Sequence, residues 1–231
     1  MKLYVREWGE GDRLAVLVHG ITSDSRSWVR VGPVLAERGY RVLAPDLRGH
    51  GQSPRGEYSA RAWADDLVET LPAGPELAIG HSLGGLALAL AVERLRPRRA
   101  VYEDPAWRTF GHTHEAAASA FEARKLLSRE DLARENPRWS DADVEGSLAS
   151  IAAWDQASVR ALLNGSSYDY TPSRPAVPSL AVLADPSALI PPELAEELQR
   201  RGFEVRTVAG AGHSVHRDDL EGFLGSLDGW V

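Results

Sequence analysis

The strongest constraint on the fold comes from one short stretch, Ile79-Gly80-His81-Ser82-Leu83-Gly84-Gly85. Residues 76–79 read as a short buried strand, and residues 86–92 as an apolar, alanine-rich helix. The chain must therefore reverse sharply at Ser82. Glycine suits the flanks of such a corner, because the turn crowds neighbouring backbone and leaves no room for a Cβ. We expect Ser82 to have a strained backbone, with its hydroxyl exposed at the N-terminus of the helix.

Strand and helix patterns alternate along most of the chain. Strand patterns, several of them continuous apolar runs typical of buried strands, occupy residues 2–8, 13–18, 40–44, 76–79, 100–102, 179–184 and 204–208. Helical patterns between them include residues 27–38, 58–71 and 192–201. This alternation predicts an α/β fold with a mostly parallel sheet and helices on both faces.

One long segment interrupts the alternation. Residues 106–170 show no convincing strand and read as several short helices, with starts near Ser128, Ser140 and Asp155. We therefore expect a helical lid, residues 106–170, inserted into a core formed by residues 1–105 and 171–231. Aromatic residues of this segment form a small lid core or line a pocket: Trp107, Phe110, Phe121, Trp139 and Trp154.

Composition excludes several classes of function. The net charge of −7 argues against a surface for nucleic acid or anionic membrane. The chain has no cysteine, so disulfides, thiolate metal sites and a cysteine nucleophile are excluded. The charged N-terminus does not resemble a signal peptide, and no apolar run reaches the roughly 18 residues of a membrane span. We expect a cytoplasmic protein, whose oligomeric state the sequence does not indicate.

Ser82 needs a base, because a neutral hydroxyl is a poor nucleophile. His213 is the best of the seven histidines: it follows a strand and lies after the glycine-flanked loop Gly210-Ala211-Gly212, at the sheet edge expected for Ser82. His216 is the competitor.

Four motifs together resemble the α/β-hydrolase family over essentially the full chain. They are His19-Gly20, the run from Asp46 to Ser53, Gly80-His81-Ser82-Leu83-Gly84-Gly85, and Gly212-His213. The resemblance implies an esterase-like serine hydrolase with a helical lid that acts on a carboxylic ester or related small acyl substrate. By this resemblance, the enzyme needs no metal or organic cofactor. The serine argues against the members with an aspartate nucleophile, such as epoxide hydrolases and haloalkane dehalogenases.

The acid that orients the histidine is open between two places. The chain order serine, aspartate, histidine fits Asp185, after the strand of residues 179–184. The common family pattern, however, puts the acid where this chain has Ser187. Some members instead take it from the end of the preceding core strand, here Glu103 and Asp104. We predict Asp185, with the acidic pair as the alternative.

The tetrahedral intermediate needs backbone N–H donors for its oxyanion. Leu83 N–H, at the start of the helix, is one candidate, and the resemblance implies Ile21 N–H as the other. The same catalytic set also supports thioesterase, lactonase, carbon–carbon bond hydrolase and cofactor-free perhydrolase activity. A hydrolase-fold ligand receptor with slow turnover is the alternative from another class.

Overall fold

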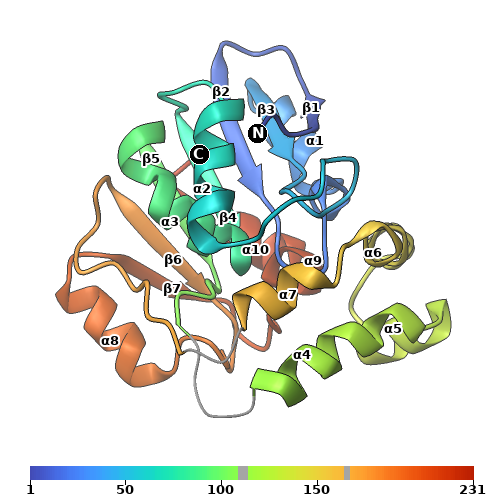
Figure 1. The fold of residues 1–231 in the computed structure, drawn as a ribbon. Helices are drawn as coiled ribbons and strands as arrows, with labels where there is room; N and C mark the ends of the chain where they lie inside the picture. Colours follow the sequence, from blue (N-terminus) through green and yellow to red (C-terminus); the bar gives the residue numbers. More distant parts are fainter. Residues whose placement is uncertain (109–113, 164–166) are drawn as a thin grey trace.

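The computed structural model describes residues 1–108, 114–163 and 167–231. They contain a seven-stranded sheet with helices packed around it (Figure 1). The strand order is β1-β3-β2-β4-β5-β6-β7. The edge strand β1 pairs antiparallel with β3, and every other neighbouring pair is parallel. The strand bounds are β1 Val5–Trp8, β2 Arg13–Val18, β3 Tyr40–Pro45, β4 Leu77–His81, β5 Arg99–Glu103, β6 Ser179–Leu183 and β7 Glu204–Thr207.

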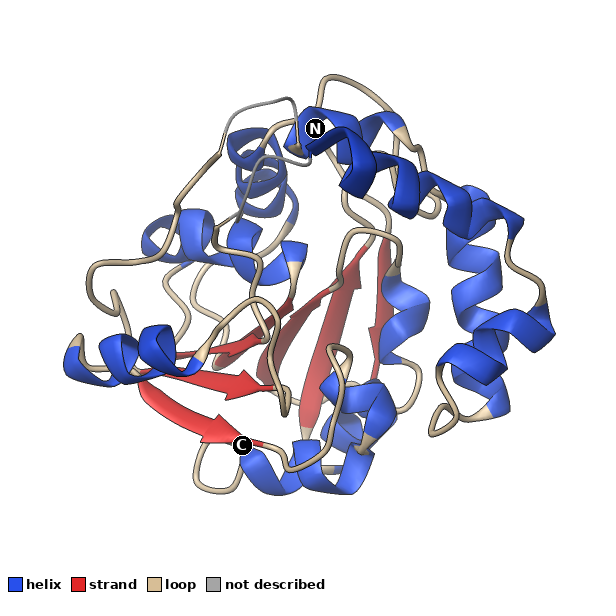
Figure 2. Ribbon diagram, turned by 90° about the horizontal axis from the view of Figure 1, so that it is seen from below, coloured by secondary structure: helices blue, strands red, loops and turns tan. Residues whose placement is uncertain are grey.

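Helices cover both faces of this sheet (Figure 2). One apolar core contains Leu67 of α2 (Ala60–Thr70), Leu86 of α3 (Leu83–Leu95) and Leu194 of α8 (Pro192–Arg200). The other contains Leu35 of α1 (Val31–Glu37) and Phe223 of α10 (Leu220–Ser226). Because the strands contribute alternate side chains to the two cores, each helix layer is fixed to its own face. This is the mostly parallel sheet with helices on both faces that the alternation predicts.

The helix expected over residues 27–38 is interrupted. A 3₁₀ helix, η1, covers Ser25–Trp28, and α1 begins only at Val31. Pro33 explains the late start: it has no N–H, so it is tolerated in the first turn of a helix but cannot donate within a longer one. The final helix is likewise divided, into α9 (Val215–Asp218) and α10.

The segment between β5 and β6 is helical where the structure describes it. It contains α4 (His114–Ala123), η2 (Arg124–Leu126), α5 (Arg129–Glu135), α6 (Asp141–Ala153) and α7 (Ala157–Leu162). Ser128 and Ser140 begin α5 and α6 as expected, each in a reciprocal capping box with the aspartate three residues on. Leu132, Val144 and Ile151 form a small apolar cluster within this helical segment (residues 114–163).

Polar contacts attach the helical segment to the sheet domain. Asp155 N–H donates to the Gly49 carbonyl at 2.7 Å, and the Tyr58 hydroxyl donates to the Asp155 carboxylate at 2.6 Å. Arg30 forms an ion pair with Asp143 of α6 at 2.9 Å. The segment therefore lies against the loops at the carboxyl ends of the strands, where ligands of open α/β sheets bind.

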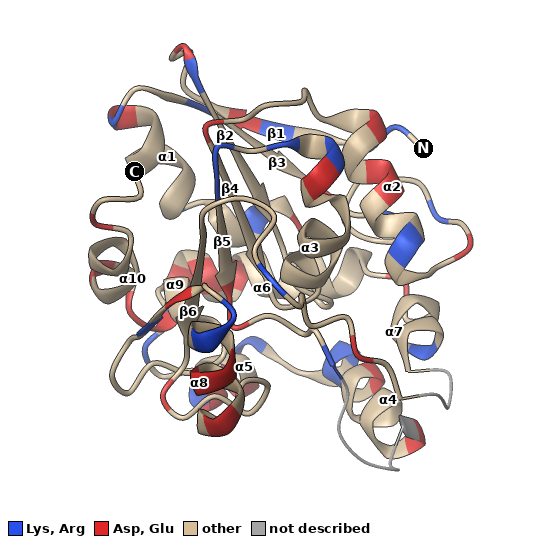
Figure 3. Cartoon of the chain, turned by 90° about the vertical axis from the view of Figure 1, so that its left-hand side faces the viewer, with Lys and Arg blue, Asp and Glu red and all other residues tan. Residues whose placement is uncertain are grey.

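Acidic and basic residues are both spread along the chain. Figure 3 shows acidic and basic positions interspersed on the helices, rather than one continuous basic face. Among the described residues, no helix combines the length and apolar character that crossing a bilayer requires.

Candidate active site

Ser82 occupies the strained corner that its glycine neighbours predict. Its backbone has φ 52° and ψ −114°, a conformation that a residue with a side chain rarely adopts. A Cβ on Gly80 would lie 2.5 Å from the Gly84 carbonyl oxygen, and a Cβ on Gly84 would lie 2.2 Å from that of Val18. The tight passage of β4 into α3 therefore requires glycine at both positions.

Backbone hydrogen bonds hold this corner against the end of β5. Ser82 N–H donates to the Glu103 carbonyl at 3.0 Å, and Ala106 N–H donates to the Ser82 carbonyl at 3.0 Å. The nucleophile candidate and the residues just after β5 are thus fixed to one another before any substrate arrives.

A cavity of about 410 Å³ opens beside Ser82. Ser82, His213 and Ile21 all line it, and so do residues of the helical segment, among them Phe121 and Trp139. Its volume suits a small organic molecule. The two strongest sequence candidates, Ser82 and His213, therefore share one site although 131 positions separate them in the chain.

Asp104 contacts His213. His213 Nδ1 lies 2.6 Å from Asp104 Oδ2. An ionised carboxylate only accepts hydrogen bonds, so Nδ1 carries the proton and Nε2 keeps a free lone pair. The Asp104 side chain is 1% exposed and that of His213 is 47% exposed, so the histidine meets the cavity while its acid is enclosed.

Asp185 was predicted as the partner of His213, and the structure corrects that choice. Asp185 Oδ2 instead accepts the Gly210 N–H at 3.0 Å, and Asp185 N–H donates to the Ala211 carbonyl at 2.8 Å. Asp185 thus fixes the loop that leads to His213. The correction follows from strand order: β5 lies next to β4, so its end is one strand closer to Ser82 than that of β6.

Ser187 has a role that the sequence did not reveal. Its hydroxyl donates to Asp104 Oδ1 at 2.6 Å and accepts the Ile190 N–H at 2.8 Å. Ser187 stands where the common family pattern places the acid, and here its hydroxyl binds the carboxylate of Asp104, which follows the preceding core strand. A serine at the usual place of the acid, together with an aspartate at the end of the preceding core strand, was the feature of the sequence that could have indicated Asp104 as the partner of His213.

A second acid–histidine pair lies behind the first. His216 Nδ1 is 2.8 and 2.9 Å from the two carboxylate oxygens of Glu103, and His216 N–H donates to Oε1 at 3.0 Å. The His216 ring stacks on Trp28 with 4.3 Å between ring centres. Burial lowers the pKa of His216 well below its ordinary value and raises the pKa of Glu103. Both side chains are enclosed, so this pair is structural.

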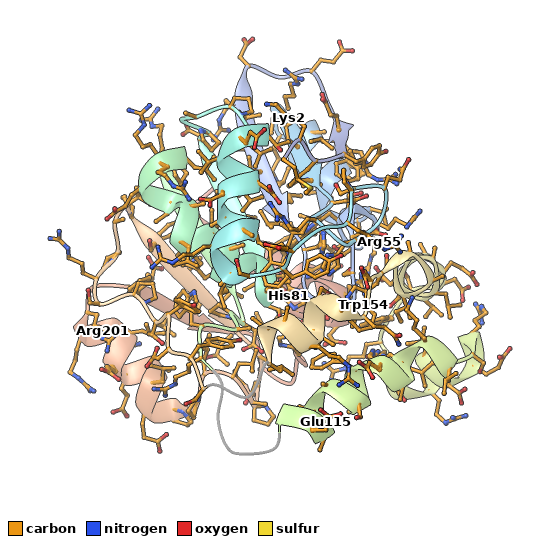
Figure 4. The ribbon with its side chains drawn as sticks, viewed as in Figure 1. Lys2, Arg55, His81, Glu115, Trp154 and Arg201 are labelled. Carbon is orange, nitrogen blue, oxygen red and sulfur yellow. The ribbon has the colours of Figure 1, made fainter. Side chains whose placement is uncertain are left out.

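His81, next to Ser82, connects the two pairs. Its Nε2 donates to the His213 carbonyl at 3.0 Å, and its ring lies 4.7 Å from the His213 ring and 5.4 Å from the His216 ring. His81 is 6% exposed, and in Figure 4 it lies near the centre of the view, whereas Arg201 and Glu115 lie toward its edge. Burial lowers the pKa of His81, which favours the neutral ring, and His81 also lines the cavity beside Ser82.

The loop after β2 is held by the glycine-rich turn of residues 46–53. Leu47 N–H donates to His19 Nε2 at 2.9 Å, which puts the His19 proton on Nδ1, 2.8 Å from the Gly20 carbonyl. His50 Nε2 contacts the Ile21 carbonyl at 2.5 Å. Burial lowers the pKa of His19 and of His50 to about 4. The turn therefore holds the loop that places Ile21 at the cavity.

Of the two residues predicted to donate backbone N–H groups to the oxyanion, one lines the cavity and the other begins the helix after Ser82. Ile21 lines the cavity, and Leu83 is the first residue of α3, directly after Ser82. The aromatic residues of the predicted lid also divide. Trp107 and Trp154 are fully buried in the main core, Phe121 and Trp139 line the cavity, and Phe110 lies outside the described residues.

Comparison with known proteins agrees with this architecture. The model of the alpha/beta hydrolase family matches residues 15–225. An uncharacterized protein of Mycobacterium tuberculosis is 47% identical over 75 residues, 30% of this chain and 22% of that protein. The (E)-2-((N-methylformamido)methylene)succinate hydrolase of Acinetobacter baylyi is 31% identical over 144 residues, 58% of this chain and 52% of that protein. The chain thus spans about half or less of these two relatives.

A solved structure of E-2-(acetamidomethylene)succinate hydrolase covers far more of the molecule. It superposes with a TM-score of 0.76 at 25% identity, over 98% of this chain and 94% of that one. The family model reaches from β2 to α10 and includes the Ser82 corner and the His213 loop. The chain is therefore a member of the α/β-hydrolase family.

Proposed function

We propose that this protein is a serine hydrolase that cleaves a small carboxylic ester through an acyl-enzyme on Ser82. The observation that carries the proposal is the meeting of three groups at one site. Ser82 is strained at the cavity wall, His213 lines the same cavity, and Asp104 holds the Nδ1 side of His213. These are the roles of nucleophile, base and orienting acid.

The proposed reaction has two halves. In the first, Ser82 Oγ attacks the substrate carbonyl while His213 Nε2 takes the hydroxyl proton, and His213 then donates that proton to the leaving alcohol. In the second, His213 activates a water that attacks the acyl-enzyme and releases the acid and free Ser82. Asp104 keeps the proton on Nδ1 and stabilises the imidazolium that forms in each half.

Two backbone N–H groups, of Ile21 and Leu83, are proposed to bind the oxyanion. Leu83 N–H lies at the N-terminus of α3, where the helix dipole favours negative charge. Ile21 is positioned by the His19 and His50 contacts of its loop. Donors fixed in this way need no rearrangement as charge develops, and one of them is worth about 3–4 kcal/mol of barrier.

The helical segment is proposed to act as a lid over this cavity. Phe121 and Trp139 line the cavity from that segment, whereas Ile21 and Ser82 line it from the sheet domain. A small acyl group would lie between these apolar rings and the nucleophile.

Amide hydrolysis is the second candidate. It is favoured by two similar proteins, the hydrolases of (E)-2-((N-methylformamido)methylene)succinate and of E-2-(acetamidomethylene)succinate, whose names contain an N-methylformamido or an acetamido group. The proposed catalytic groups serve both reactions, because His213 can protonate an amine leaving group as readily as an alcohol.

The test is hydrolysis of p-nitrophenyl esters of increasing acyl length, compared with the matching p-nitroanilides. Ser82→Ala should abolish turnover, and Ser173→Ala, at an exposed serine outside the cavity, should retain it. A fluorophosphonate should add one phosphonyl group to the unaltered protein and none to Ser82→Ala, as measured by intact mass. Turnover that survives in Ser82→Ala would reject the proposal.

A further inference from the structure

Arg217 is an unusual wall residue of the cavity beside Ser82. It belongs to α9, four positions after His213, and only 5% of it is exposed. Arginine is almost never enclosed to this extent without an anionic partner, because taking an ion out of water is costly. A carboxylate that forms an ion pair with the Arg217 guanidinium is therefore expected among its neighbours.

Within the described residues, few of the N–H groups of this guanidinium have a hydrogen-bond partner. Arg217 Nη2 donates to the Ser23 hydroxyl at 3.0 Å, and the guanidinium carbon lies 4.6 Å from the centre of the Trp139 ring. Arg217 Nε is buried and has no hydrogen-bond partner within the described part of the chain. A guanidinium has five N–H groups, so a hydroxyl and a ring face satisfy only a fraction of its capacity.

Each nearby carboxylate has a partner other than Arg217. Asp143 Oδ2 pairs with Arg30 at 2.9 Å, whereas Asp143 Oδ1 is buried without a hydrogen-bond partner among the described residues. Asp24 pairs with Arg26, Glu103 binds His216, and Asp218 accepts the Trp139 indole N–H at 2.9 Å. Over residues 1–108, 114–163 and 167–231, no carboxylate forms an ion pair with Arg217. Burial lowers the pKa of Arg217, and the negative charges of Asp143, Glu103, Asp24 and Asp218 oppose that effect.

The other charges of the cavity do not supply the missing partner. Arg124 and Glu135 both line it and pair with each other at 3.6 Å. Arg138 adds a further positive charge, and its Nη1 donates to the Gly210 carbonyl at 2.6 Å. The cavity thus carries an excess of positive charge close to the proposed nucleophile.

We propose that Arg217 and Ser23 bind a carboxylate of the substrate, so that the preferred substrates are small acyl compounds bearing a carboxylate apart from the scissile bond. This inference rests on the proposed function, because it assigns the substrate class of the same site. A carboxylate matches the planar fork of a guanidinium, and the Ser23 hydroxyl adds a donor beside it. Ser23, Arg217 and Ser82 line one cavity, so we expect one small molecule to contact all three.

The experiment compares mono-p-nitrophenyl succinate with its methyl ester, p-nitrophenyl methyl succinate. The two have the same scissile bond and chain, and differ in one charge. We expect the unaltered protein to prefer the anion in kcat/KM by about 10- to 100-fold. Arg217→Met should remove this preference, Arg217→Lys should retain part of it, and Arg129→Met should leave the ratio unchanged. Arg129 is an arginine of the helical segment outside the cavity, paired with Asp141 and Glu145.

Several outcomes would overturn the inference. Equal use of the two esters by the unaltered protein, with turnover still dependent on Ser82, rejects the carboxylate site and leaves the proposed function standing. An anion preference that survives Arg217→Met in a folded variant, judged by circular dichroism, also rejects it.

A binding measurement tests the carboxylate site even if neither ester is hydrolysed or Arg217→Met does not fold. Calorimetry of Ser82→Ala with succinate and with succinamide needs neither turnover nor a folded Arg217→Met variant. We expect succinate to bind at least about tenfold more tightly. Equal affinity for the two compounds would overturn the carboxylate site, even if no ester proves to be a substrate.

Discussion

The acids of two acid–histidine pairs lie next to each other at the end of β5, and the two histidines differ in their access to solvent. Asp104 pairs with His213, whose side chain is 47% exposed, and Glu103 pairs with His216, whose side chain is 1% exposed. A histidine that meets the cavity can exchange a proton with substrate. An enclosed histidine between a carboxylate and an indole ring cannot. The comparison teaches that burial separates a proposed catalytic pair from a structural one.

Backbone direction produces the difference. Successive side chains of a strand point to opposite sides, so Glu103, the last residue of β5, and Asp104 cannot face the same neighbours. Asp104 also leaves the strand with φ 37°, which turns the chain at this point. Glu103 thus reaches His216 in the interior, and Asp104 reaches His213 at the cavity.

The largest effect should come from removing the acid of the exposed pair. Asp104→Asn cannot hold the same tautomer of His213, and we expect kcat/KM for p-nitrophenyl acetate to fall by about 10³- to 10⁴-fold. Asp185→Asn is the matched control and should stay within about tenfold, because the Asp185 carboxylate accepts a hydrogen bond from the loop before His213 and, within the described residues, forms none with His213 itself. A large loss in Asp185→Asn with a small loss in Asp104→Asn would reverse the assignment.

Acidification should destabilise the protein through its buried histidines. The pKa values of His19 and His50 are lowered to about 4, so between pH 6.5 and 4 the unfolded chain binds protons that the native state does not. Stability is therefore lost as the pH falls through this window, by up to about 3 kcal/mol for each residue. Glu103 acts in the opposite sense, since its pKa is raised. The free energy of unfolding in urea, measured at pH 7.5 and 5, tests this.

His50→Gln is the variant that isolates the cause of this pH dependence. It should be less stable at pH 7.5 but should lose less stability on acidification than the unaltered protein. An unchanged pH dependence would mean that His50 does not contribute to it.

Breaking the enclosed pair should affect stability more than rate. Glu103→Gln exchanges one acceptor oxygen at His216 for a donor, and we expect the free energy of unfolding to fall by about 1–3 kcal/mol. Ester hydrolysis by the folded variant should fall less than about tenfold, because His213 keeps Asp104. Glu145→Gln, at an exposed glutamate of α6, should change neither quantity appreciably. Loss of rate without loss of stability would assign Glu103 a catalytic role.

The smallest effect concerns the support of the acid. Ser187→Ala removes a hydrogen bond to Asp104, and we expect kcat/KM to fall by roughly fivefold, with the acid limb of its pH profile moving upward. The shift follows because a carboxylate with fewer donors attracts the histidine proton more strongly. Ser173→Ala is the control. A lower rate with an unmoved acid limb would indicate a purely structural role for Ser187.

The sequence by itself determined the parts that depend on neighbouring residues. The glycines around Ser82 and the alternation of strands and helices follow from sterics and side-chain period, which act over a few positions. Ser128 and Ser140 likewise mark helix starts, because a capping box needs only residues three apart.

Only the tertiary structure decided which acid meets His213 and which side chains form the cavity. Asp104 and His213 are 109 positions apart, and their contact depends on strand order and on the path of two loops. Asp185 satisfied the chain order equally well, since sequence order carries no distance. The sequence gives no sign of the burial of Arg217 either, because that burial arises from tertiary contacts such as those with Ser23 and Trp139. Such long-range packing depends on the whole sheet, and no local pattern encodes it.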